Sequence, residues 1–128
     1  MILPAISIRQ PWAFLICERG KDVENRTWAC PQKYFGQLVL LHAGQSPIVP
    51  GHENFGDHVP PLCGYALPLG GVVGLARILG CVKHSTSLWA EPGQFHWLLA
   101  EARSLPFYPC KGRLGFFQVD YPHEVPNA

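Results

Sequence analysis

Residues 71–82 read GVVGLARILGCV, a long apolar run that contains no proline and only one charged side chain, that of Arg77. Aliphatic and β-branched residues dominate this run, which is typical of a strand buried in a sheet. Gly74 and Gly80 interrupt it, and we expect these two positions to mark bends or bulges. The run therefore predicts one long strand.

Shorter apolar or alternating segments on both sides of this run predict the remaining strands. A Pro-rich stretch at residues 106–109 predicts a turn before the last of them. The expected strands cover residues 5–9, 23–28, 37–43, 95–102 and 112–119, in addition to residues 71–82. Five or six strands of this length predict a closed or half-open β-barrel.

One short helix is expected between the first two strands. Pro11 suits the first turn of a helix, because the N–H that proline lacks has no partner there. Helical spacing continues through Trp12, Leu15, Ile16 and Arg19. Gly20 is a suitable end, so we expect a helix of about two to three turns.

The composition agrees with a small, mainly β protein with one helix. The chain has 128 residues, of which 48% are hydrophobic and 15% are charged, and this predicts one packed domain over residues 1–128. Its 13 glycines and 13 prolines favour short strands joined by turns over a helical bundle.

The formal net charge is only +1, which argues against a surface that coats nucleic acid regardless of sequence. A local basic cleft for a short single strand or a nucleoside stays open. The five cysteines are far apart and form no C-x-x-C pair, which argues against a zinc ribbon or a disulfide framework and suits a reducing compartment. No basic leader or long apolar segment is present, so we expect a cytoplasmic protein without membrane contact.

The chemistry-bearing residues concentrate where the helix meets the second strand. Lys21, Glu24 and Arg26 lie within six positions, and a period of two places Glu24, Arg26 and Trp28 on one strand face. A carboxylate beside a lysine keeps it cationic or exchanges a proton with it, and an arginine binds phosphate or stacks on a base. We expect these side chains to converge on solvent inside a cleft. The alternative is an ion-paired turn that only closes the barrel.

Two separated motifs resemble a known family. Residues 7–13 read SIRQPWA and residues 19–28 read RGKDVENRTW, which is similar to the S-x-[RK]-Q-P-W-A segment and the G-x-K-x-x-E-x-R signature of ASCH domains. Arg19 occupies the family's first Gly position, with Gly20 one place later. Residues 109–119, PCKGRLGFFQV, resemble the closing P-x-K-G-x-L-G-x-F strand. The resemblance covers about residues 5–43 and 95–120.

The resemblance implies a PUA-like barrel with a cleft beside the first helix, lined by the signature residues Lys21, Glu24 and Arg26. Family members are thought to bind RNA, and some have ribonuclease activity. One bacterial branch hydrolyses acetylated cytidine with the signature lysine and a threonine at the position of Glu24. Glu24 offers no such hydroxyl, and strand periodicity directs Thr27 to the opposite face.

Three functions follow as alternatives. The first is a module that binds single-stranded RNA or a modified nucleoside; its expected ligand contacts are Arg9, Gln10, Lys21, Glu24, Arg26, Trp28 and Lys111. The second is a metal-independent hydrolase on the same cleft, with Lys21 and Glu24 as its catalytic acid–base pair and water as nucleophile. The third is a protein-interaction barrel. No cofactor and no metal are expected in any of them.

The segment from 44 to 69 has no clear period, and we expect it to form a helical turn or to cover a site. It contains His52, Glu53, Asp57 and His58, whose spacing does not match the H-E-x-x-H zinc motif. His42, at the end of an apolar strand, is expected to be a buried histidine with satisfied hydrogen bonds.

Overall fold

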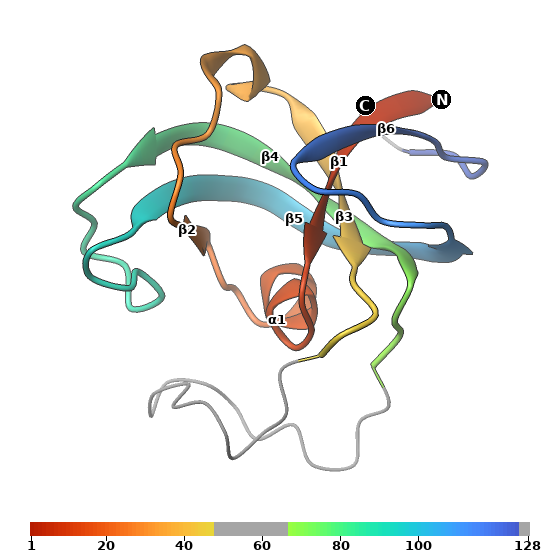
Figure 1. Cartoon of the computed structure of the whole chain (residues 1–128), viewed down its shortest axis with the longest axis horizontal. Coiled ribbons are helices and arrows are strands. Elements are labelled where there is room, and N and C mark those ends of the chain that lie inside the picture. Colours follow the sequence, from red (N-terminus) through yellow and green to blue (C-terminus); the bar gives the residue numbers. More distant parts are fainter. Residues whose placement is uncertain (48–66, 126–128) are drawn as a thin grey trace.

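A computed structural model describes residues 1–47 and 67–125 of the chain (Figure 1). It contains six strands, one α-helix and one short 3-10 helix. In chain order the elements are β1 (Ile2–Ile8), α1 (Trp12–Glu18), β2 (Val23–Arg26), η1 (Gln32–Tyr34), β3 (Leu38–Ala43), β4 (Gly71–Val82), β5 (Phe95–Pro109) and β6 (Phe116–Asp120). The expected mainly β fold with one short N-terminal helix is confirmed.

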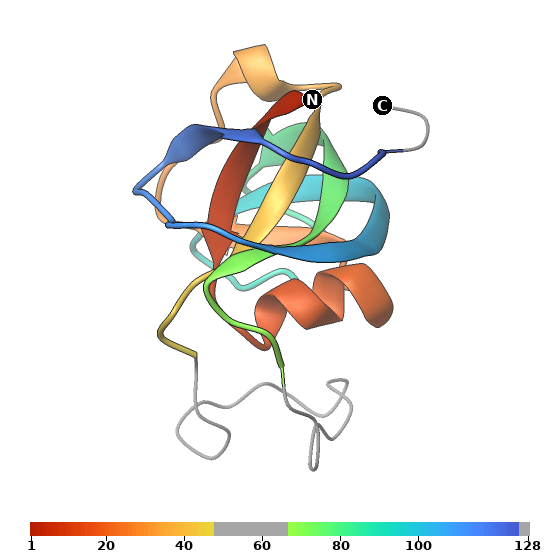
Figure 2. The same ribbon diagram turned by 90° about the vertical axis from the view of Figure 1, so that its right-hand side faces the viewer.

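The six strands form one mixed sheet in the order β2-β5-β4-β3-β1-β6. Strands β1 and β3 are parallel, and the other neighbouring pairs are antiparallel. The sheet curls into a half-barrel, and α1 lies at one end of it (Figures 1 and 2). β2 and β6 are the two outer strands, so they border the seam where the barrel does not close by strand pairing.

Hydrophobic side chains fill both faces of the sheet. One cluster includes Ile6, Ile8, Ile16 and Trp97, and the other includes residues such as Leu40. All six residues of β3 are buried, because this strand has packed layers on both of its faces. That burial accounts for the continuous apolar run LVLL in its sequence.

The helix begins and ends as the sequence predicts. The N–H of Leu15 donates to the carbonyl of Pro11 at 2.9 Å, which forms the first turn. Gly20 has φ +75°, a left-handed conformation that glycine adopts without steric cost. The carbonyl of Leu15 then accepts hydrogen bonds from the N–H groups of Arg19 and Lys21. This turn reverses the chain and directs Lys21 back toward the protein.

The helix packs closely on β4 because a glycine lies beneath it. A Cβ atom on Gly74 would lie 2.4 Å from the Sγ of Cys17 in α1 and 2.5 Å from the carbonyl oxygen of Arg103. Register shifts between β4 and β5 occur next to Gly74 and next to Gly80. The expectation that both glycines mark irregularities in the strand is confirmed.

Strand β5 is longer than the sequence predicts, and the expected turn at residues 106–109 is wrong. The register pairs Val72 with Tyr108 and Gly74 with Ser104, so residues 105–107 lie opposite Val73 alone in a bulge. Pro106 falls within this bulge, where a strand tolerates a residue that cannot donate a hydrogen bond. The strand therefore continues through both prolines.

Other strand limits differ by a few residues. β2 ends at Arg26, before Trp28, because its last register partner is Phe95, the first residue of β5. β6 begins only at Phe116, after Gly115 at φ +68°. The part of the expected helical turn or covering segment that falls on residues 48–66, with the His52–His58 cluster, lies outside the described residues. No helix among the described residues is long and apolar enough to cross a membrane.

Candidate functional site

Lys21, Glu24 and Arg26 come together beside α1, and we call them the charged triad. The Gly20 turn supplies Lys21, and alternate positions of β2 supply the other two. Lys21 Nζ lies 3.6 Å from Glu24 Oε1. Arg26 Nε donates to Glu24 Oε2 at 2.9 Å. One carboxylate thus pairs with two cations, and Glu24 and Arg26 share a strand face as predicted.

The triad does not open to solvent as expected. The side chains of Lys21 and Glu24 are only 3% and 9% exposed, whereas that of Arg26 is 23% exposed. Burial lowers the pKa of Lys21, and the neighbouring charge of Glu24 opposes this shift. Lys21 Nζ also donates to the carbonyl of Val23 and lies 5.3 Å from the ring centre of Trp12. Only Arg26 of the three therefore offers a substantial surface to a ligand.

Arg26 also links the two sides of the barrel seam. Its Nη2 donates to the carbonyl oxygen of Ser7 at 2.7 Å. The pairing of β1 with β6 ends at Ile6 and Phe116, so this carbonyl of β1 lies just past the last register pair. The guanidinium therefore bonds to the backbone just beyond the end of strand pairing. An ion-paired turn that closes the barrel, the structural alternative, predicts this role.

A row of aromatic rings and cations follows the same seam. We call it the cation–aromatic row; its members are Lys33, Tyr34, Phe116, Trp28, Trp97, Arg26, Phe95 and Lys83. They come from η1, β6, β5, β2 and the connections after β2 and β4. The row joins segments that are far apart in the sequence. Its central ring, Trp97, is buried in the hydrophobic core, and Trp28 and the two lysines are its exposed members.

The centre of the row is a stack of three nearly parallel rings. Phe116 stacks on Tyr34 with centroids 3.7 Å apart and on Trp97 with centroids 5.5 Å apart. Trp28 meets Trp97 edge-on at 4.8 Å, and the Arg26 guanidinium lies 5.6 Å from the Trp97 ring centre. The Phe116–Trp97 and Trp28–Trp97 pairs have the preferred offset or edge-to-face geometry of aromatic contacts, whereas Tyr34 and Phe116 are stacked more closely, nearly face to face.

Two lysines border this stack. Lys33 Nζ lies 5.2 Å from the ring centre of Tyr34, and Lys83 Nζ lies 4.8 Å from that of Phe95. Both lysines are exposed, and Trp28 is 37% exposed. Each cation is within the range of a cation–π interaction, so the row keeps positive charge next to rings that solvent reaches.

Sequence reasoning missed Lys33, Lys83 and Phe95 as members of a site. No motif or spacing in the local sequence distinguishes any of the three, and they join one site only because distant elements pair in the fold. The interleaving of a lysine with an aromatic residue at Lys33-Tyr34 was the available signal. Trp28 was predicted as a ligand contact that shares a strand face with Glu24 and Arg26. It lies beyond the end of β2, but its ring still meets the Trp97 ring that Arg26 covers.

The remaining expected ligand contacts lie elsewhere. Arg9 donates to the carbonyls of Ser46 and Pro47 at 2.8 and 3.3 Å. Gln10 is 2% exposed, and its amide accepts from the Phe14 N–H at 2.9 Å and donates to the Pro68 carbonyl. Arg9 thus binds the backbone that follows β3, and Gln10 binds the first turn of α1 and the backbone that precedes β4.

Lys111 is exposed and forms no hydrogen bond, ion pair or ring contact within residues 1–47 and 67–125. His42 is buried, with Nδ1 3.0 Å from Ser7 Oγ and Nε2 2.7 Å from the Cys110 carbonyl. His42 therefore has a partner at both ring nitrogens, as expected of a buried histidine. In the part of the chain that the structure describes, no three His, Cys, Asp or Glu side chains are grouped to hold a metal.

The geometry gives little room to the acid–base pair of a hydrolase. Each carboxylate oxygen of Glu24 already faces a cation, and the Lys21 ammonium is enclosed. Thr27 is exposed but follows the end of β2. No protein-family model matches the chain, and no curated protein is significantly similar to it.

Proposed function

We propose that this chain is an ASCH-type, PUA-like module that binds single-stranded RNA or a modified nucleoside on the cation–aromatic row. The observation that carries the proposal is the alternation of cations and rings along one seam of the barrel, with Trp28 and two lysines exposed. The resemblance of residues 5–43 and 95–120 to ASCH motifs supports the same function.

The chemistry of single-stranded nucleic acid suits this surface. Bases present flat faces that stack on aromatic rings, and each such contact contributes about 1–3 kcal/mol. Phosphates lie next to the bases along the strand, where Lys33 and Lys83 supply positive charge. A protein with a net charge of only +1 can bind RNA in this way, because the positive charge is needed only along the row.

Within this function the charged triad has a positioning role. Glu24 and the Ser7 carbonyl hold the Arg26 guanidinium in a fixed orientation over Trp97. The Nη1 of Arg26 has no protein acceptor among the described residues, so its N–H groups are open to a phosphate or a base carbonyl. Lys21 pairs with the other carboxylate oxygen of Glu24 inside the protein and does not contact the ligand.

The proposal is tested by fluorescence anisotropy with a labelled short single-stranded RNA over a series of salt concentrations. Because two exposed lysines meet phosphates, log K should fall against log salt with a slope of about −1.4. The double variant Lys33→Ala, Lys83→Ala should bind weakly and lose most of this slope. The double variant Lys111→Ala, Arg113→Ala removes the same number of positive charges from exposed positions outside the row and is the matched control. Absence of binding at low salt, or equal losses in the control, would refute the proposal.

A further inference from the structure

A pocket lies on the face of the β2–β5 pair opposite to the cation–aromatic row. The register pairs Asn25 with His96, and the neighbouring pair joins Glu24 with Trp97. Because successive residues of a strand point to opposite faces, Asn25 and His96 point away from the cation–aromatic row. The connection from β4 to β5 folds over this face, and its residues form the pocket walls.

The hydrogen bonds of Asn25 fix the protonation of His96. Asn25 Oδ1 accepts from the N–H of Glu91 at 3.0 Å, and its Nδ2 donates to the carbonyl of Trp89 at 2.9 Å. The same Oδ1 lies 2.8 Å from His96 Nδ1. An amide oxygen only accepts, so Nδ1 must carry the proton. In the neutral ring Nε2 then keeps its lone pair.

The Nε2 atom of His96 is the free acceptor of this pocket. It has no hydrogen-bond partner within residues 1–47 and 67–125, although His96 is only 2% exposed. No fully enclosed side-chain nitrogen or oxygen lacks a partner in that part of the chain. The Nε2 atom therefore reaches open space through the pocket. The hydrogen bond to Asn25 orients the imidazole so that Nε2 faces the pocket, as an orienting partner does for many functional histidines.

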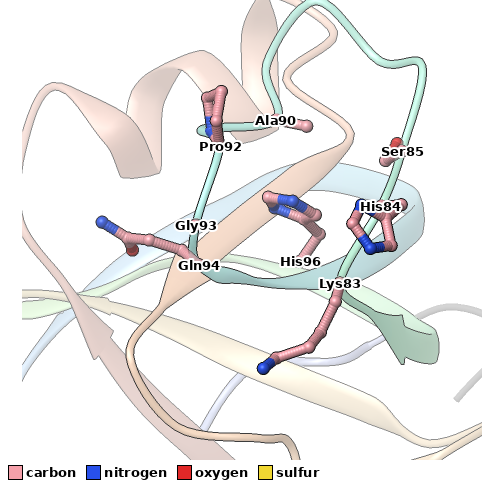
Figure 3. Close-up of a pocket in the computed structure, with 8 residues that line it drawn as sticks. All are labelled: Lys83, His84, Ser85, Ala90, Pro92, Gly93, Gln94 and His96. Atoms are coloured by element: carbon pink, nitrogen blue, oxygen red, sulfur yellow. The ribbon is translucent and has the colours of Figure 1, made fainter.

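The pocket has a volume of about 430 Å³, which falls within the usual range for small-molecule sites. Figure 3 shows the His96 ring between the segment of Ala90 and Pro92 on one side and His84 on the other. Lys83 also lines the pocket, with its side chain directed away from the His96 ring (Figure 3). No carboxylate is among the described residues that line the pocket. Ala90 and Pro92 form apolar walls, polar side chains such as Ser85 and Gln94 complete the lining, and His96 Nε2 is the buried acceptor.

We propose that this pocket binds a neutral planar heterocycle of nucleoside size, which donates an N–H to His96 Nε2. The amino group or ring N–H of a nucleobase has this chemistry, and its flat face fits between the proline and the imidazole. An anion without a bound proton is disfavoured at this atom because it has no proton to donate to His96 Nε2. The site stands on its own observations and does not depend on the function of the row.

Adenosine and cytidine are the probes, and ¹⁵N NMR of the histidine side chains reports on Nε2 directly. Each nucleoside is titrated into the whole ¹⁵N-labelled protein. We expect saturable movement of the His96 Nε2 resonance with at least one of them. His96→Phe keeps the ring shape but removes the acceptor, and it should weaken binding about tenfold or more.

Ala90→Trp, in the exposed connection, fills the pocket without changing its hydrogen bonds and keeps the test valid if His96→Phe does not fold. It should also abolish binding. Trp28→Ala removes an exposed ring of the row and no residue that lines the pocket, so this variant should bind the nucleoside normally even where RNA binding is weakened, which separates the two sites. The inference is overturned if neither nucleoside moves the resonance at the highest concentration tested, or if Ala90→Trp binds as the wild type does.

Discussion

The guanidinium of Arg26 donates a hydrogen bond of 2.7 Å to the main-chain carbonyl oxygen of Ser7, across the seam between β2 and β1. The same guanidinium pairs with Glu24 and lies over Trp97. One side chain therefore closes the half-barrel and also forms the middle of the cation–aromatic row. Stability and ligand binding are coupled at this residue, and experiments on its neighbours must separate the two.

Removing the carboxylate of Glu24 should destabilise the fold strongly. Glu24→Ala leaves Lys21 and Arg26 close together without their shared anion, and breaking a buried ion pair in this way costs about 3–5 kcal/mol. Urea unfolding followed by tryptophan fluorescence measures this loss. The alternative of a structural turn predicts the same loss, so this result alone does not decide the function.

The Arg77–Glu101 pair provides the matched control for that measurement. It joins the same two residue types, but the Glu101 side chain is 50% exposed. Glu101→Ala should cost only about 0–1 kcal/mol, because solvent screens an exposed ion pair. Similar losses for Glu24→Ala and Glu101→Ala would contradict the burial of the triad.

The lowered pKa of Lys21 makes a prediction about alkaline pH. In the window between the folded pKa of Lys21 and its ordinary value of 10.5, the unfolded chain holds a proton that the folded chain has lost. Stability from this residue should therefore rise with pH across the window and stay constant below it. The free energy of unfolding of the wild type, relative to Lys21→Met, should increase as pH is raised toward that value.

The comparison with Lys21→Met is needed because Cys17 has the opposite effect. Burial raises the pKa of Cys17 from 9.0 to about 12, so its contribution falls as pH rises above 9.0. That contribution is present in both proteins and cancels in their difference. A difference that stays flat or declines over the series would show that burial does not lower the pKa of Lys21.

Two glycines of β4 should respond differently to alanine. A methyl group at Gly74 meets Cys17 and the main-chain carbonyl of Arg103, so Gly74→Ala should cost about 1–3 kcal/mol. Nothing lies within 4 Å of a Cβ atom on Gly80. Gly80→Ala should be neutral or stabilising by up to about 1 kcal/mol. Thermal unfolding of both variants checks the packing of α1 on β4, and equal melting temperatures would exclude that close contact.

The sequence predicted those parts of the fold that local pattern determines. The strand at residues 71–82 and the end of α1 at Gly20 were predicted correctly, because an uninterrupted apolar run and a left-handed glycine each act within one segment. The length of β5 was not predicted. A proline normally ends a strand, and Pro106 is tolerated here because it lies in a bulge opposite β4.

The candidate site was predicted in part for a similar reason. The spacing along β2 correctly placed Glu24 and Arg26 on one face. Because charged side chains are usually exposed, we expected Lys21 to face solvent. Contacts from other elements bury it instead. The positions of Lys33 and Lys83 beside the ring stack depend on the curl of the whole sheet. No local pattern contains that information.

The affinity of a short single-stranded RNA for the wild type and for Trp28→Ala, measured at one fixed salt concentration, tests the central claim most directly. Trp28 is exposed and lies beyond β2, so its loss should leave the fold intact. Loss of one stacking ring should weaken binding by about 1–3 kcal/mol, while Leu88→Ala, at another exposed apolar side chain, should have no effect. Equal affinities for the wild type and Trp28→Ala would contradict binding on the cation–aromatic row.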